Sequence, residues 1–162
     1  MEIKSELLCL HGFLGNGSDF DFLKSDPEIN KLNPIAPDLF RPAASGESLS
    51  EEARHLSRQL LPKTVPLKSA LLGYSYGGRL ALEMCLQNPG HFSKLILVST
   101  GFGICGTEAR AERAESDEKW AQIFLEKPWN ECLKLWSSQE ILSSVGDVLG
   151  SRDEALYSRE RL

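Results

Sequence analysis

The feature that most constrains the fold is the pentapeptide Gly73-Tyr74-Ser75-Tyr76-Gly77. It follows a short apolar run, typical of a strand buried on both faces, and precedes a segment whose apolar residues recur at helical spacing. A serine in so sharp a strand-to-helix turn has a strained backbone, and the two flanking glycines avoid the clash that larger side chains would cause. We therefore predict a nucleophile elbow with Ser75 as the nucleophile. The alternative is a tight helix-entry turn with no catalytic role.

Apolar runs and amphipathic stretches alternate through the first hundred residues. Strands joined by helices at this spacing form βαβ units with a parallel sheet, so the fold class is α/β. One helix is expected to begin after Ser48, because Ser48 and Glu51 have the spacing of a capping box. The other expected elements are strands at Leu7–Leu10, Pro34–Leu39, Ser69–Gly73 and Lys94–Ser99, a short helix at Phe20–Leu23 capped by Ser18 or Asp19, and a helix at Gly78–Leu86 whose first glycine allows close packing on the sheet.

After Gly101 the sequence becomes polar and favours helices, with three tryptophans and no convincing strand. Separate short helices are predicted at Asp117–Leu125, Trp129–Trp136 and Ser151–Leu162. We interpret residues 1–103 as the core of the α/β fold and residues 104–162 as a helical cap over the sheet.

Composition narrows the class of protein further. The net charge of −5 argues against binding to nucleic acid, but it does not exclude a local basic pocket for a small anion. Cys9 and Cys85 lie in apolar runs and are expected to be buried thiols, and the four cysteines form no CxxC pair that would indicate a metal site. The sequence shows neither a signal peptide nor a run of about 20 apolar residues that could span a membrane. We expect a reduced, cytoplasmic protein.

A second motif, His11-Gly12-Phe13-Leu14-Gly15, follows the first predicted strand. In folds built around a nucleophile elbow, the loop after this strand and the residue after the nucleophile each donate one backbone N–H to an oxyanion hole. Here the donors would be Phe13 and Tyr76. His11 is interpreted as a structural histidine that hydrogen-bonds its own loop; a general base is the less favoured alternative.

Three segments together resemble the MenH family of 2-succinyl-6-hydroxy-2,4-cyclohexadiene-1-carboxylate synthases, which have the α/β-hydrolase fold. The segments are Leu10–Gly15, Gly73–Arg79 and Glu112–Ala121, and the resemblance covers essentially the whole chain. Arg79, directly after the double glycine, is more specific than the pentapeptide, because generic esterases usually carry an apolar or small residue there. The family usually has methionine after the serine, where this chain has Tyr76.

The resemblance implies a lyase of menaquinone biosynthesis that uses no cofactor and no metal. Removal of a proton next to a carbonyl drives loss of pyruvate from 2-succinyl-5-enolpyruvyl-6-hydroxy-3-cyclohexene-1-carboxylate. A serine activated by histidine acts as the base, and the oxyanion hole holds the developing enolate. Arg79 and Arg113 would bind the carboxylates of this substrate, and Tyr74 and Trp136 would line the pocket.

Each of these positions also has a structural interpretation. An arginine in the first turn of a helix is disfavoured by the helix dipole, which favours a functional role for Arg79. Arg113 lies in a charged run, so a solvated helix face explains it equally well. Trp136 is more typical of core packing than of ligand contact.

The sequence lacks a credible base. In this fold the acid and the histidine of the triad follow the serine, yet the only histidine after Ser75 is His91, which is expected at the opposite end of the sheet. His55 precedes the elbow. The chain also stops before the last strands of the family, so we expect an N-terminal portion that is inactive alone and self-associates through the edge of its last strand. A generic serine esterase or thioesterase and a non-catalytic binding protein of the same fold are the alternatives.

Overall fold

The computed structural model describes residues 6–39, 48–61, 68–142 and 152–157. The described chain divides into two compact units, one ending at Phe102 and one beginning at Gly103. Among the described residues, the first unit contains the strands and the second only helices, so the strand-rich and helix-rich parts of the sequence form separate compact units.

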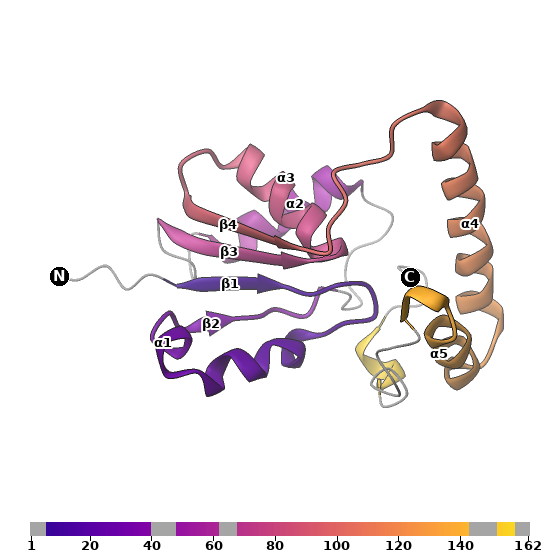
Figure 1. The fold of residues 1–162 in the computed structure, drawn as a ribbon, viewed down its shortest axis with the longest axis horizontal. Helices are drawn as coiled ribbons and strands as arrows, with labels where there is room; N and C mark the ends of the chain where they lie inside the picture. The colour runs from indigo at the N-terminus through magenta and orange to yellow at the C-terminus, as the bar shows by residue number, and fades with distance from the viewer. Residues whose placement is uncertain (1–5, 40–47, 62–67, 143–151, 158–162) are drawn as a thin grey trace. The chain divides into compact units, whose positions relative to one another are not determined.

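The first unit is built on a parallel sheet of four strands in the order β2-β1-β3-β4 (Figure 1). The predicted parallel α/β arrangement is therefore confirmed. The second strand is shorter than the Pro34–Leu39 segment we expected, because only its first two residues pair with β1. Pro37 has no N–H to donate to a ladder, which is consistent with the early end of this strand. The strands are β1 (Leu7–Leu10), β2 (Pro34–Ile35), β3 (Ser69–Tyr74) and β4 (Phe92–Val98).

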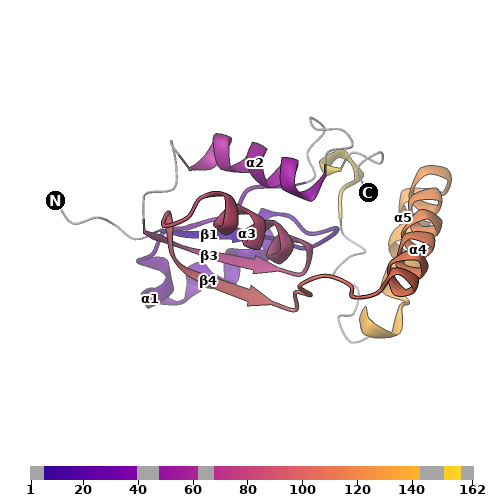
Figure 2. The same cartoon turned by 90° about the horizontal axis from the view of Figure 1, so that it is seen from above.

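Helices cover both faces of this sheet. The chain crosses from β1 to β2 in one direction and from β2 to β3 in the other, and right-handed crossovers then place the connecting helices on opposite faces. Figure 2 shows α2 beside α3 on one face, with α1 on the other. The helical elements are η1 (Gly17–Ser25), α1 (Pro27–Asn30), α2 (Leu49–Leu60) and α3 (Tyr76–Gln87).

Two helix starts test the capping predictions. At α2 the capping box is confirmed: the Glu51 N–H donates to Ser48 Oγ at 3.3 Å, and the Ser48 N–H donates to the Glu51 carboxylate at 2.9 Å. The bonds that the Ser48 N–H and the Ser48 hydroxyl donate to the Glu51 carboxylate hold its pKa below the usual value. At η1 the expected cap was wrong. This 3-10 helix begins at Gly17 rather than near Phe20, so Asn16 is its cap. The Asn16 side chain accepts a bond from the Ser18 N–H, and the Asn16 N–H donates to the Asp19 carboxylate, which completes a capping box.

Burial differs sharply between the central strand and the last strand. All four residues of β1 are buried, as the continuous apolar run predicts. On β4, Ile96 and Val98 are each 42% exposed, although they belong to the continuous apolar run Leu95–Val98. Within the described residues, β4 pairs only with β3, so one backbone edge of β4 faces no other described strand.

The described part of the second unit contains α4 (Thr107–Glu126), α5 (Trp129–Ser137) and the short 3-10 turns η2 (Glu140–Leu142) and η4 (Glu154–Leu156). The helix at Trp129–Trp136 is confirmed. The helix predicted at Asp117–Leu125 starts ten residues earlier, in a charged run with ion pairs at i,i+4 spacing that favour helix. The predicted helix Ser151–Leu162 is wrong over residues 152–157, which contain only η4, and its remaining residues lie outside the described ranges.

All four cysteines are free thiols. Cys9 is fully buried in β1, and this burial raises its pKa to about 12. Cys85 is only half-buried, so the expectation of a buried thiol is confirmed for Cys9 alone. Among the described helices, none combines the length and apolar character needed to cross a bilayer.

Candidate active site

Ser75 lies between the last residue of β3 and the first residue of α3, as the pentapeptide predicts. Its backbone has φ 51° and ψ −114°, a conformation that residues with a side chain rarely adopt. Such a residue typically costs about 1–3 kcal/mol and persists only where its surroundings impose it. The local geometry is therefore that of a nucleophile elbow.

The backbone of Ser75 is held by the end of β4. Its N–H donates to the Val98 carbonyl at 2.9 Å, and its carbonyl accepts a bond from Thr100 Oγ1 at 3.2 Å. Ser99, between these two partners, also has a positive φ of 51°. Two residues with positive φ thus directly follow the neighbouring strands β3 and β4, and the bonds with Val98 and Thr100 hold the turn at Ser75.

Two glycines of the elbow are required by close approach. A β-carbon at Gly77 would overlap the carbonyl oxygens of Leu10 and His11 at the end of β1. A β-carbon at Gly78 would overlap the hydroxyl of Thr100. The expectation that Gly78 lets α3 pack closely on the sheet is therefore confirmed.

The loop after β1 lies directly beside the elbow. A β-carbon at Gly12 would be 2.9 Å from the ring of Tyr74 and 3.3 Å from Cβ of Ser75. Phe13 follows Gly12 in this loop, and the buried Leu14 has a positive φ of 56°. Tyr76 is the first residue of α3, so its backbone N–H points out of the positive end of the helix. Of the two predicted oxyanion donors, Tyr76 directly follows Ser75 in the chain, and Phe13 belongs to the loop whose Gly12 lies beside Ser75.

His11 is a structural residue. It is 1% exposed, and its Nε2 accepts a bond from the Leu39 N–H at 2.9 Å. A backbone N–H can only donate, so the proton of the ring is on Nδ1, which donates to the Gly12 carbonyl at 2.9 Å. The expected bond to its own loop is confirmed, and the ring also ties this loop to the segment after β2.

The other two histidines do not approach the elbow. His55 lies on the exposed side of α2 beside Gln59. His91 directly precedes β4, and its carbonyl accepts a bond from Lys68, at the amino end of β3. Ser75 is at the carboxyl end of the same strand, so the predicted separation of His91 from Ser75 is confirmed.

The side chain of Tyr76 contacts one residue of α2 and one of α3. Its hydroxyl donates to the Glu52 carboxylate at 2.5 Å, and the Arg79 guanidinium lies 5.3 Å from its ring centroid. Glu52 is only 8% exposed, next to the apolar residues of α2, a helix that packs against α3. The sequence analysis did not single out Glu52. A carboxylate among the apolar residues of an amphipathic helix could have indicated a buried polar contact at this position.

Arg79 and Tyr74 belong to the same unit as Ser75. Both are exposed, Tyr74 at 43%, and Tyr74 is the last residue of β3. The structure therefore brings together five of the seven predicted site residues. These are Phe13, Tyr74, Ser75, Tyr76 and Arg79.

The remaining two, Arg113 and Trp136, belong to the second unit. Arg113 is exposed on α4 and forms an ion pair with Asp117 at 2.7 Å. Trp136 packs edge-to-face on Trp120, with ring centroids 4.7 Å apart. Both positions have the structural explanation anticipated from the sequence, a solvated helix face and an aromatic core.

The described residues contain no cluster of three or more His, Cys, Asp or Glu side chains that could hold a metal ion.

Comparison with known proteins identifies the family. Residues 7–130 match the family model described as the alpha/beta hydrolase fold. The chain belongs to the α/β-hydrolase family. The TM-score is 0.74 against MenH from S. aureus, with 21% identity over 99% of this chain and 64% of that one. It is 0.64 against a thermophilic esterase from Thermogutta terrifontis, with 18% identity over 96% of this chain and 62% of that one.

Curated relatives of this α/β-hydrolase are named 2-succinyl-6-hydroxy-2,4-cyclohexadiene-1-carboxylate synthase. The protein of Pectobacterium atrosepticum is 31% identical over 153 residues, which cover 90% of this chain and 58% of the relative. The protein of Escherichia coli K12 is 29% identical over 142 residues, covering 87% of this chain and 56% of the relative. The chain thus spans somewhat more than half the length of these relatives.

The strain at Ser75 gives a first prediction. Replacing Ser75 with glycine should raise the free energy of unfolding by about 1 kcal/mol, because glycine adopts a positive φ without steric cost. Ser75→Ala retains the strained β-carbon and should change it by less than about 0.5 kcal/mol. Urea unfolding followed by far-UV circular dichroism measures both variants. Equal stability of the glycine and alanine variants would show that the elbow stores no strain.

The bonds of His11 give a second prediction. His11→Leu preserves much of the buried volume but leaves the Leu39 N–H without its acceptor, so stability should fall by about 2 kcal/mol. His55→Leu on the exposed side of α2 is the matched control and should stay within about 0.5 kcal/mol of the parent. The same urea titration compares them. A loss no greater than that of the control would rule out the structural role of His11.

Proposed function

We propose that this chain is the nucleophile-bearing portion of a 2-succinyl-6-hydroxy-2,4-cyclohexadiene-1-carboxylate synthase, an enzyme of menaquinone biosynthesis. The supporting observation is the strained elbow at Ser75 together with Arg79 four residues later, in a chain whose curated relatives carry that name. The reaction class is a lyase that eliminates pyruvate. We further propose a cytoplasmic protein with no cofactor, because the proposed chemistry requires only proton transfer and charge stabilisation.

Elimination of pyruvate from an enolpyruvyl ether breaks a carbon–oxygen bond after a proton is removed next to a carbonyl. The carbonyl oxygen gains negative charge as the proton leaves. The N–H groups of Phe13 and Tyr76 are proposed to bind this oxygen, since the loop after β1 and the start of α3 meet beside Ser75. The positive end of α3 favours the same charge.

Ser75 needs a partner to accept its proton, because a serine hydroxyl is a weak base at neutral pH. His91 cannot serve, since it lies at the amino end of the sheet. We propose that the histidine and the acid correspond to the part of the relatives that this chain does not span, and that the chain alone is inactive.

The substrate carries several carboxylates, and a guanidinium pairs well with a carboxylate. We propose that Arg79 and Arg113 bind these groups, with Tyr74 and Trp136 lining the substrate pocket. Arg79 is exposed, and its contact with the Tyr76 ring leaves the guanidinium hydrogen-bond donors available to a carboxylate. To bind a substrate carboxylate, Arg113 would have to break its ion pair with Asp117. In this proposal residues 104–162 act as a helical cap over the core formed by residues 1–103.

A chimera tests the proposal. This chain is joined to the portion of the Pectobacterium atrosepticum relative that it does not span, and pyruvate release is followed by coupled oxidation of NADH. The chain alone should release no pyruvate, and the chimera should. Ser75→Ala in the chimera should lower kcat by at least about 100-fold, because it removes the proton-transfer group.

Two controls make the chimera informative. Arg113→Gln should raise KM, whereas Arg110→Gln, three residues earlier on α4 and also exposed, should not. Turnover of p-nitrophenyl esters without pyruvate release would instead support a generic esterase. A folded chimera unaffected by Ser75→Ala would support a non-catalytic protein. Reading the gene beyond codon 162 for an aspartate followed by a histidine tests the same proposal independently.

We also propose that the chain alone self-associates through β4, whose outer edge meets no described strand and whose Ile96 and Val98 are partly exposed. Ile96→Lys combined with Val98→Lys should shift the chain toward the monomer in sedimentation-velocity measurements, because lysines on an edge strand oppose pairing. Leu86→Lys is the control, since Leu86 is 68% exposed on α3, away from this edge. A parent chain that is monomeric at all concentrations would contradict the proposal.

A further inference from the structure

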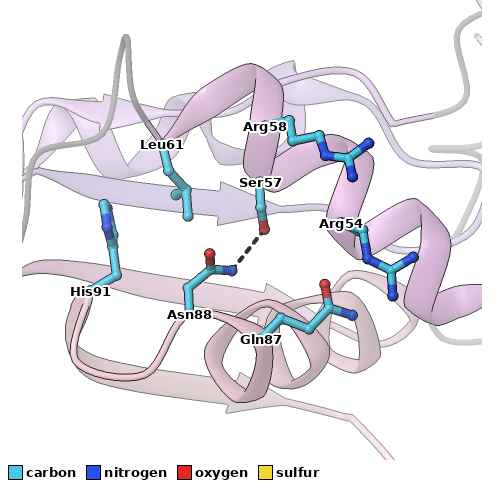
Figure 3. A pocket seen from close by; sticks show the side chains of 7 residues that line it. All are labelled: Arg54, Ser57, Arg58, Leu61, Gln87, Asn88 and His91. Atoms are coloured by element: carbon cyan, nitrogen blue, oxygen red, sulfur yellow. Dashed lines mark hydrogen bonds between the residues drawn. The ribbon is translucent and has the colours of Figure 1, made fainter.

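A groove of about 640 Å³ lies between the last turns of α2 and α3, on the first unit (Figure 3). Two guanidinium groups, Arg54 and Arg58, stand on its α2 side. Two amide side chains, Gln87 and Asn88, stand on its α3 side, and Leu61 and His91 lie toward one end. The groove is separate from the elbow: α3 starts directly after Ser75 and extends for 12 residues, about 17 Å, before it reaches the groove.

The arginine pair indicates an anionic ligand. Arg54 and Arg58 are one turn apart on α2, and like charges at this spacing disfavour the helix. Both side chains are exposed, and neither forms an ion pair with the residues that the structure describes. Arg54 attracts the Glu51 carboxylate electrostatically, but that carboxylate accepts its hydrogen bond from Ser48, and the Glu83 carboxylate accepts from Gln87. A carboxylate in the groove could bind both guanidinium groups.

The amide side of the groove indicates that the ligand also donates hydrogen bonds. Gln87 Nε2 donates to the carbonyl and the hydroxyl of Ser50, each at 2.9 Å. Gln87 Oε1 is buried and has no hydrogen-bond partner among the described residues. A buried acceptor left without a partner typically costs about 1–3 kcal/mol, which a donor on a ligand would recover.

Asn88 offers a second hydrogen-bond acceptor on the α3 side of the groove. Its Nδ2 donates to Ser57 Oγ at 3.0 Å and to the Met84 carbonyl at 2.8 Å, so the amide nitrogen is committed to the protein. Figure 3 shows the amide oxygen of Asn88 turned toward the groove. The carboxyl ends of α2 and α3 also carry partial negative charge, which favours a positive or hydrogen-donating group at this side.

We propose that this groove binds a small amphoteric acid, in which a carboxylate is accompanied by an ammonium or hydroxyl group a few bonds away. The carboxylate binds Arg54 and Arg58, and the donor group binds the amide oxygens of Gln87 and Asn88. Amino acids and hydroxy acids share this chemistry. This site is independent of the proposed synthase reaction, because it uses none of the residues around Ser75.

The test is a titration of the ¹⁵N-labelled chain with L-glutamate, 2-hydroxyglutarate and glutarate, followed through the side-chain signals of arginine, glutamine and asparagine. Glutamate or 2-hydroxyglutarate should shift the signals of Arg54, Arg58 and Gln87 in a saturable manner, and whichever binds more tightly identifies the donor as ammonium or hydroxyl. Glutarate, which has no such donor, should bind at least about tenfold more weakly, since a lost hydrogen bond of about 1.4 kcal/mol changes affinity by that factor.

A double variant separates the groove from general charge effects. Arg54→Gln with Arg58→Gln should weaken binding by at least about tenfold, because both charge-assisted bonds to the carboxylate are lost. Arg110→Gln with Lys134→Gln removes the same charge from exposed sites of the second unit and should leave binding unchanged. The absence of saturable shifts, equal binding of glutarate, or equal losses in the two double variants would each overturn the proposal.

Discussion

The first unit depends on the bond between the Ser75 N–H and the Val98 carbonyl, because this bond and the one from Thr100 Oγ1 impose the strained turn at Ser75. The strain at Ser75 costs free energy that the local chain cannot recover by itself. It is offset by the close fit of α3 against the ends of β1 and β4, which is possible only with glycine at positions 77 and 78. The geometry of the pentapeptide therefore depends on the hydrogen bonds that it makes with the end of β4.

The elements that sequence predicted well are those whose signal is local. The pentapeptide and the capping box at Ser48 specify their geometry within five residues, and both formed as expected. The cap at Asn16 was missed because Asn16, Ser18 and Asp19 lie within four residues and each has the chemistry to cap, so only the start of η1 decides between them. The length of α4 was missed because its ion pairs, such as Arg113–Asp117, add to helix stability without any apolar periodicity.

The parts of the site that sequence could not provide are contacts between distant segments. His11 binds Leu39, 28 residues away, and Tyr76 binds Glu52, 24 residues away. Neither pairing leaves a spacing pattern, because each depends on how α2 and the segment after β2 pack against the elbow. The aromatic contacts of Trp136 depend likewise on the packing of α5 against α4, so its dual interpretation as pocket wall or core could not be resolved from spacing alone.

The tyrosine at position 76 changes the surroundings of the proposed oxyanion hole without altering the N–H that the hole uses. A methionine there would pack without directional contacts. Tyr76 instead reaches the buried Glu52 through its hydroxyl and contacts Arg79 through its ring. The carboxylate, the phenol and the guanidinium therefore form a chain of contacts from α2 to the first turn of α3. Such a chain restrains both the first residue of α3 and the arginine that we propose binds substrate, which offers a physical reason for an arginine at a helix position that the dipole disfavours.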